Sequence, residues 1–135
     1  MRILLLILIS FSFSFAKVVV DKKTDFMWQD NLDAKSVQKN WQGAKNYCEA
    51  LTLEGYNDWF LPRQEQLLTI SDKTKYNPAI KEEFKNVASS YYWSSSTYVS
   101  IPEHAWGVYF KHGNSYYDDK QRERFVRCVR SAKSK

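Results

Sequence analysis

The chain has 135 residues, which suits one ordinary domain with a real hydrophobic core and excludes a fold that depends on many disulfide or metal staples. Twenty Lys and Arg against fifteen Asp and Glu give a net charge of +5, which is compatible with an anionic partner without demanding one. No low-complexity tract or internal repeat is present, which excludes solenoid and linker-rich architectures.

The first sixteen residues have the pattern of a secretory signal peptide. Arg2 precedes the unbroken aliphatic run 3–9, and Ser14 and Ala16 place small side chains at the −3 and −1 positions of a cleavage site. The apolar run is shorter than the roughly 20 residues that span a bilayer, although an uncleaved membrane anchor is the alternative. We therefore expect residues 1–16 to be removed, leaving a single domain over 17–135 without a transmembrane span. Its expected location is the periplasm, the cell surface or the medium.

The first part of the exported chain predicts short strands and then a helix. Residues 17–20 and 26–28 predict an opening hairpin, and the polar residues 30–39 predict a loop. A helix should begin after Asn40, a suitable N-cap, and end before Gly55. Helical spacing places one set of side chains on the face toward the core: Trp41, Ala44, Cys48 and Leu51.

A second helix is predicted over residues 63–71, because Pro62 suits its first turn. Its inward side chains should be Leu67, Leu68 and Ile70. Asn77 and Pro78 predict a turn, and Ile80 and Phe84 behind it predict a short helical piece.

The last third predicts antiparallel sheet. Residues 91–97 form one strand, 106–110 alternate with the two-residue period of a half-buried strand, 111–114 form a hairpin turn, and 115–118 return. Residues 124–130 form the closing strand. Its alternation separates Val126 and Cys128 from Phe125, Arg127 and Val129. The expected fold class is α+β, with early helices packed on a late antiparallel sheet.

The two cysteines, Cys48 and Cys128, favour a disulfide in an exported protein. The bridge would tie the first helix to the last strand and close a loop of about 80 residues, worth at most roughly 4.5 kcal/mol in the chain-entropy model. Reactive or metal-binding thiols are the alternative, but no CxxC motif or neighbouring histidine supports them.

Several separated motifs carry a family resemblance. They are Trp41-x-x-Ala44-x-x-x-Cys48-x-x-Leu51, residues 55–62 (GYNDWFLP) with Glu65, residues 92–96 (YWSSS), the Ala105-Trp106 strand and residues 126–130 (VRCVR). Together they resemble the C-terminal domain family of the collagen-like adhesin Lcl, over nearly the whole span from Met27 to Arg130. The resemblance implies a C-type-lectin-like fold, shared with formylglycine-generating enzymes and variable receptor-binding proteins. Relatives commonly carry arginine where this chain has Phe60, which puts in doubt any salt bridge or ligand contact made by that arginine.

Catalysis and metal binding are not expected. Formylglycine-generating enzymes work through additional cysteines, and no nucleophile, base and orienting group can be assembled here. His104 and His112 are too few for a zinc site, so no cofactor is expected. Calcium lectins use a Glu-Pro-Asn loop and a late Trp-Asn-Asp, which are both missing. Asp118 and Asp119 could ligate calcium, but an acidic pair in a turn is usually solvated.

Other polar and aromatic residues divide into scaffold and surface. Residues 94–96 are serines that we expect to bond to neighbouring backbone. The rings expected in the core are Trp41, Trp93 and Trp106. The rings expected to be exposed are Tyr98, Tyr109, Tyr116 and Tyr117.

The leading hypothesis is an adhesion or ligand-binding module rather than an enzyme. Relatives at the end of collagen-like adhesins are implicated in binding sulfated polysaccharides, so the resemblance implies an anionic polysaccharide as partner, and no nucleic acid is expected. The predicted ligand-binding residues are Lys111, His112, Tyr116, Tyr117, Lys120, Arg122 and Arg124. These charges could equally form an ordinary solvated face. The alternative function is a structural or assembly subunit that binds a partner protein in the cell envelope through exposed aromatics.

Overall fold

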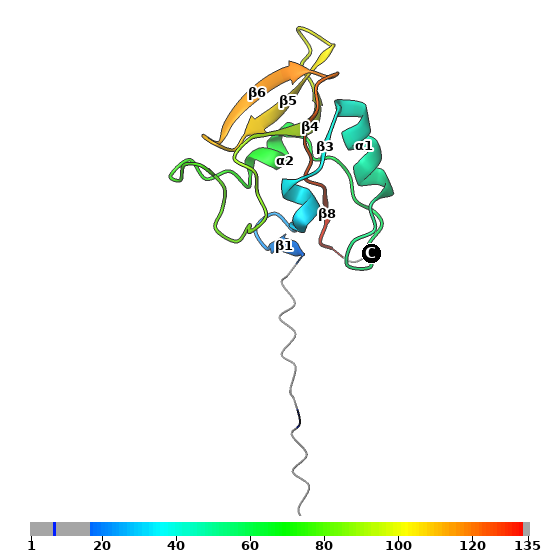
Figure 1. Cartoon of the computed structure of the whole chain (residues 1–135), viewed down its shortest axis with the longest axis vertical. Coiled ribbons are helices and arrows are strands. Elements are labelled where there is room, and N and C mark those ends of the chain that lie inside the picture. Colours follow the sequence, from blue (N-terminus) through cyan, green and yellow to red (C-terminus); the bar gives the residue numbers. More distant parts are fainter. Residues whose placement is uncertain (1–6, 8–16, 134–135) are drawn as a thin grey trace, which may run out of the picture.

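The computed structural model describes Ile7 and residues 17–133 of the chain, so the predicted signal peptide lies outside the described residues except for Ile7. The fold is α+β, as the sequence predicts (Figure 1). In chain order the elements are β1 (Val18–Asp21), β2 (Phe26–Gln29), the 3-10 helix η1 (Leu32–Lys35), β3 (Gln38–Lys39), α1 (Trp41–Ala50), α2 (Gln64–Leu68), β4 (Tyr91–Thr97), β5 (His104–Tyr109), β6 (Asn114–Asp119), β7 (Arg124–Phe125) and β8 (Val129–Ser131).

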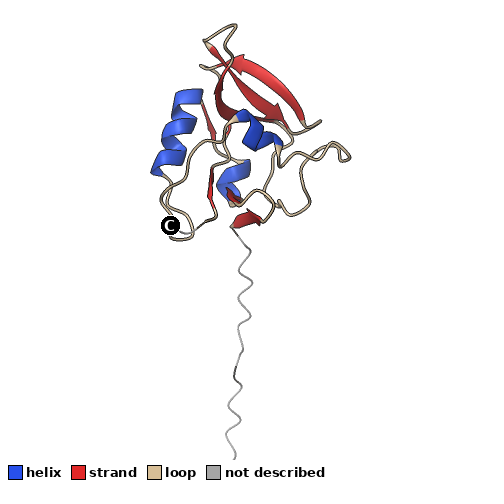
Figure 2. Cartoon of the chain, turned by 180° about the vertical axis from the view of Figure 1, so that it is seen from behind, coloured by secondary structure: helices blue, strands red, loops and turns tan. Residues whose placement is uncertain are grey.

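The strands form two sheets. The smaller sheet has the order β1-β2-β8, so β2 pairs both with β1 and with the last strand of the chain. The larger sheet has the order β3-β7-β4-β5-β6, and its three long strands lie at the opposite end of the molecule from β1 (Figure 1). The helix α2 packs against β4 and β5, while α1 lies beside the sheet (Figure 2).

Two buried clusters and a disulfide hold the elements together. One cluster joins α1 to Trp93 and Val126, and the other joins α2 to Tyr92 and Val129. Cys48 of α1 is bonded to Cys128, which confirms the predicted bridge between the first helix and the closing segment. The predicted alternation is confirmed as well, because Val126 and Cys128 belong to the first cluster and Phe125 and Val129 to the second.

The first helix matches its prediction closely. It begins at Trp41, and the Asn40 side chain accepts a hydrogen bond from the Gly43 N–H at 2.8 Å. The second helix is shorter than predicted, since it ends at Leu68, although the predicted inward residues Leu67 and Ile70 are buried.

Three element predictions are wrong. The segment with Ile80 and Phe84 is not helical: both side chains are buried, but Ile80 forms an isolated bridge with Ser71. Residues 30–39 are not only a loop, because they contain η1 and β3. The closing strand is divided into β7, in the larger sheet, and β8, in the smaller sheet. Cys128 lies between them, and its backbone bonds to Gln29 of β2 in the smaller sheet. A single alternating segment therefore passes from one sheet to the other.

Two basic residues near the C-terminus, Arg127 and Arg130, form buried contacts that stabilise the fold. Arg127 is fully buried, and its guanidinium forms an ion pair with Asp30 at 3.1 Å and donates to the Asn86 carbonyl at 2.6 Å. Arg130 is nearly buried and pairs with Asp58, with its guanidinium 3.7 Å from the centre of the Tyr56 ring. These two charges therefore add little to the surface potential.

Candidate functional site

A groove of about 360 Å³ opens on one face of the β4–β5–β6 sheet. Its lining residues are Tyr91, Tyr109, His112, Tyr116, Tyr117, Asp118 and Arg124. Four of them were predicted from the sequence as ligand-binding residues, namely His112, Tyr116, Tyr117 and Arg124. The groove therefore combines aromatic rings with the ion pair of Arg124 and Asp118.

The floor of the groove depends on a glycine. Gly107 of β5 lies opposite Trp93 of β4 and Tyr116 of β6, and the ring of Tyr91 crosses directly over it. A Cβ on Gly107 would lie 2.4 Å from the ring carbon Cζ of Tyr91. Only glycine leaves room for this buried ring, whose hydroxyl donates to the Ala105 carbonyl at 3.1 Å.

The walls of the groove are rings that pack on one another. The Tyr109 ring lies 5.9 Å from that of Tyr116, edge to face, and 5.8 Å from His112. His112 is also in contact with Tyr76, at 5.3 Å between ring centres. Gly113, with a φ of +83°, makes the turn that brings His112 back over the sheet. The result is a set of half-exposed ring faces held by the strand register.

Two arginines surround one carboxylate at the edge of the groove, where Arg124 lines it and Arg122 lies beside it. Asp118 accepts from Arg124 at 2.6 Å and lies 3.5 Å from Arg122, so two guanidinium groups share one negative charge. Arg124 also lies 5.5 Å from the centre of the Tyr91 ring. Burial raises the pKa of the Tyr91 phenol, and the Asp118 carboxylate raises it further, so this hydroxyl stays protonated.

The remaining predicted ligand-binding residues lie outside the groove. The Lys120 ammonium donates to the Thr97 hydroxyl at 3.0 Å and lies 4.1 Å from the centre of the Trp41 ring. Lys111 precedes His112 in the turn, where its carbonyl accepts from the Asn77 N–H. The predicted patch is thus divided between the groove and the surface beside α1.

The two adjacent tyrosines of β6 both line the groove, but their rings have different partners. Tyr116 faces the groove walls, whereas the Tyr117 ring stacks on Tyr98 at 4.0 Å with an interplanar angle of 9°. Trp106 meets this stack edge-on, at 5.0 Å from Tyr98. Trp106 was predicted to be a core residue, and so was Trp41, but both are only partly buried because their rings pack against surface side chains. Trp93 is fully buried, as predicted.

Sequence reasoning missed the parts of the groove that depend on register. Tyr91 and Gly107 form the floor of the groove, and Asp118 supplies its negative charge. No spacing in the sequence indicates that these three residues lie together. The serines were interpreted correctly: Ser94 donates to the Trp106 carbonyl at 2.7 Å, and Ser96 accepts from the Gln64 N–H at 3.0 Å.

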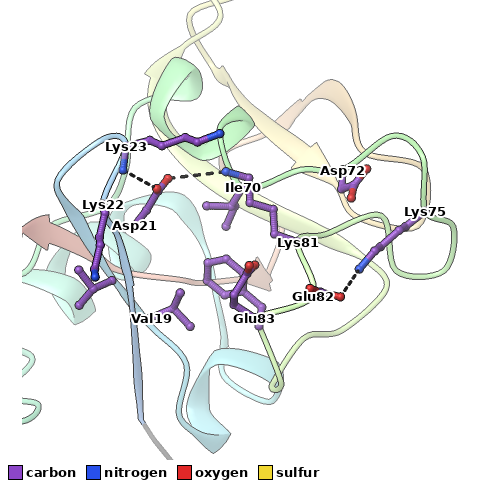
Figure 3. A pocket seen from close by; sticks show the side chains of 12 residues that line it. Val19, Asp21, Lys22, Lys23, Ile70, Asp72, Lys75, Lys81, Glu82 and Glu83 are labelled. Atoms are coloured by element: carbon purple, nitrogen blue, oxygen red, sulfur yellow. Dashed lines mark hydrogen bonds and ion pairs between the residues drawn. The ribbon is translucent and has the colours of Figure 1, made fainter.

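A second cleft, of about 520 Å³, lies between the β1–β2 turn and the segments around residues 70–75 and 81–84 (Figure 3). Its rim carries equal numbers of basic and acidic side chains: Lys22, Lys23, Lys75 and Lys81 with Asp21, Asp72, Glu82 and Glu83. Lys81 lies 3.6 Å from Asp21, and Lys75 lies 4.0 Å from Glu82. Because the charges balance, the rim of this cleft has no net charge to attract a polyanion.

Potential metal ligands and membrane spans were examined over the described part of the chain. Within residues 17–133, no three His, Cys, Asp or Glu side chains gather in a way that could hold a metal ion. Asp118 and Asp119 do not converge, since adjacent strand residues point to opposite faces. No helix in the same described residues is long and apolar enough to cross a membrane.

Comparison with protein families gives one match. The family described as Lcl C-terminal domain matches residues 17–130, which include every element from β1 to Val129 and Arg130 of β8. No curated protein matches the chain significantly.

Proposed function

The chain belongs to the Lcl C-terminal domain family, and from this premise we propose that it is an exported, non-catalytic module that binds an anionic glycan. Its location would be the periplasm, the cell surface or the medium. The Cys48–Cys128 disulfide supports export, because such bonds form and persist in oxidising compartments. The proposed function is thus adhesion or ligand capture by one small domain.

A C-type-lectin-like fold is part of this proposal. It is supported by the layout of the domain, in which the early helix α1 packs beside a late antiparallel sheet. The small sheet, in which β2 pairs with the last strand, β8, agrees with it, and so does the disulfide from α1 to the closing segment.

The observation that carries the ligand class is the meeting of ring faces and cations in the sheet groove. Half-exposed tyrosines such as Tyr109 and Tyr116 offer the flat apolar faces on which sugar rings stack, and their hydroxyls remain able to hydrogen-bond. Arg122 and Arg124 share one carboxylate, so this end keeps a net positive charge that would attract a carboxylate or sulfate ester.

Binding without catalysis follows from the same chemistry. Both cysteines are in the disulfide, and the phenol of Tyr91 is kept protonated, which makes it a hydrogen-bond donor rather than a base. We propose that neither a metal nor an organic cofactor takes part, and that nucleic acid is not a partner.

A partner protein in the cell envelope is the second candidate, and a different surface favours it. The Tyr98–Tyr117 stack and Trp106 adjoin the loop between β4 and β5, on which Val99 is 85% exposed and Ile101 is also exposed. Contiguous aromatic and aliphatic exposure of this kind is typical of protein contact surfaces.

The test is retention of the disulfide-bonded protein on dextran sulfate and on uncharged dextran, at low and high salt and with or without a calcium chelator. We expect salt-sensitive retention on dextran sulfate alone. Tyr116→Ala should weaken it about threefold through lost ring stacking, and Arg122→Gln by up to about fivefold. The matched control Lys133→Gln removes a charge that pairs with Asp25 at the β1–β2 turn, and should leave binding unchanged.

Each result tests one part of the proposal. Equal retention on both dextrans would contradict an anionic ligand, and loss on chelation would contradict the proposed absence of a metal. If neither polymer is retained, glycan binding is wrong and the Val99 surface becomes the leading candidate.

A further inference from the structure

Two lysines from distant parts of the chain meet at the ring of Trp41. Lys45 lies one helical turn after Trp41, so its side chain reaches the same face of α1, and its ammonium is 4.6 Å from the ring centre. Lys120 follows β6 and lies 4.1 Å from the same centre. Cation–π contact holds both charges against the same ring.

The position of Lys120 and Trp41 is built into the fold. The Lys120 carbonyl accepts from the Trp41 N–H at 3.0 Å, and the Trp41 indole donates to the Ser94 carbonyl at 2.9 Å. The Lys120 ammonium is held by the Thr97 hydroxyl. These bonds join α1, β4 and the turn after β6, so the position of the Lys120 charge does not depend on a freely moving side chain.

The two lysines have no acidic partner in ion-pair contact among the described residues. Within residues 17–133, neither Lys45 nor Lys120 forms an ion pair, whereas the nearby Arg122 and Arg124 both pair with Asp118. The first turn of α1 carries no acidic residue either, so the positive end of the helix dipole adds to the same field. Two ammonium groups that contact the same ring repel each other. Binding of an anion near both would reduce this repulsion and is therefore favourable.

We propose that Trp41, Lys45 and Lys120 form a second anion-binding site, which takes a sulfate or carboxylate group. The site is separate from the tyrosine groove but adjoins it. Lys39, two residues before Trp41, lies directly opposite Arg124 in the β3–β7 pair, and Arg124 lines the groove. A linear polyanion could therefore place one acidic group at Arg124 and another at Trp41, and this extension rests on the proposed function.

The site can be tested with a small anion, independently of any glycan. The probe is sodium sulfate, titrated against sodium chloride at equal ionic strength, while the five indole N–H signals of the disulfide-bonded protein are followed by NMR. Trp41→Phe assigns the Trp41 signal. We expect a saturable shift of this signal with sulfate but not with chloride, because both ammonium groups contact the Trp41 ring. A shift that does not saturate, or that chloride reproduces, would overturn the proposal.

Charge removal then locates the site. Lys45→Gln alone should weaken sulfate binding by up to about fivefold, and Lys45→Gln with Lys120→Gln by about tenfold or more. Lys133→Gln is the matched control and should leave the titration unchanged. Because Lys45 makes only a surface ring contact, the single variant remains informative even if loss of Lys120 disturbs the fold.

Dextran sulfate distinguishes this inference from the proposed function. If the polymer binds and the lysine variants bind it as well as the wild type, the second site is wrong while glycan binding stands. If sulfate shifts Trp41 but the polymer is not retained, the site stands and the proposed function is wrong.

Discussion

At the scale of single residues, the absence of a side chain matters as much as the presence of one. Tyr91 reaches the groove because Gly107 carries no Cβ, and the ring then shields the backbone where β4, β5 and β6 meet. The same ring gains its raised pKa from this burial and from Asp118. One glycine therefore determines both the shape of the groove floor and the protonation state of its hydroxyl.

Gly107→Ala should destabilise the domain by about 3 kcal/mol, because the new methyl group would overlap the Tyr91 ring and the Tyr92 carbonyl. Urea denaturation measures the change in the free energy of unfolding. The control is Gly43→Ala, where a Cβ would approach two side chains and no backbone, namely Asn40 at 2.9 Å and Lys39 at 3.4 Å. A gain in helix propensity of up to about 1 kcal/mol offsets that contact. Equal stability of the two variants would show that Gly107 tolerates a side chain.

At the scale of elements, polar side chains connect segments that do not share a sheet. Tyr47 of α1 donates to the Asp33 carboxylate of η1 at 3.0 Å and accepts from Gln29 of β2 at 3.1 Å. Asp30 accepts from the backbone N–H groups of Lys85 and Asn86, each at 3.0 Å. These contacts hold the irregular segments in place where no strand pairing is available.

The Tyr47 contact predicts an alkaline loss of stability. Burial and the Asp33 carboxylate raise the pKa of Tyr47 to about 12, above its value of 10 in an unfolded chain. The folded state therefore binds the phenolic proton more tightly, and its contribution is complete below pH 10 and lost as the pH rises toward 12. After allowance for solvent exposure, the contribution is about 1 kcal/mol.

Tyr47→Phe removes this contribution along with the hydrogen bonds. The difference in unfolding free energy between wild type and variant should therefore shrink between pH 8 and pH 11, as measured by urea denaturation. Tyr76→Phe alters an exposed phenol and should show a constant difference. A Tyr47→Phe difference that does not vary with pH would contradict the coupling to Asp33.

At the scale of the whole molecule, the Cys48–Cys128 bond connects an early helix to the end of the domain. It joins α1 to the segment between β7 and β8, and so ties the helix to both sheets. Both sulfurs lie in the first buried cluster, next to Trp93 and Val126. The bridge closes most of the domain into one loop.

Replacing both cysteines by serine should lower the free energy of unfolding by roughly 4 kcal/mol, since the unfolded chain regains the entropy of a loop of about 80 residues. Urea denaturation of Cys48→Ser/Cys128→Ser measures the loss. Wild-type protein unfolded and refolded with a reducing agent is the control, because it lacks the bond but keeps the side-chain volume. If both retain wild-type stability, packing alone holds α1 to the closing segment.

Much of the local structure could be predicted because it depends on short-range periodicity. The N-cap at Asn40, the buried face of α1 and the alternation through residues 125–129 follow from helical and strand spacing. The helix predicted near Ile80 failed because two buried apolar residues four apart fit a buried irregular segment equally well. Burial was thus predicted better than backbone conformation.

By itself the sequence determined the α+β class, the first helix, the disulfide and the family, because these depend on spacing, composition and motifs along the chain. Only the tertiary structure decided which predicted ligand residues meet. The β5–β6 register places Tyr116 opposite Gly107, and the turn after β6 carries Lys120 to Trp41. The physical reason is that register and docking are selected by packing between distant segments. The spacing of residues along the sequence does not give the distance between such segments in the folded protein.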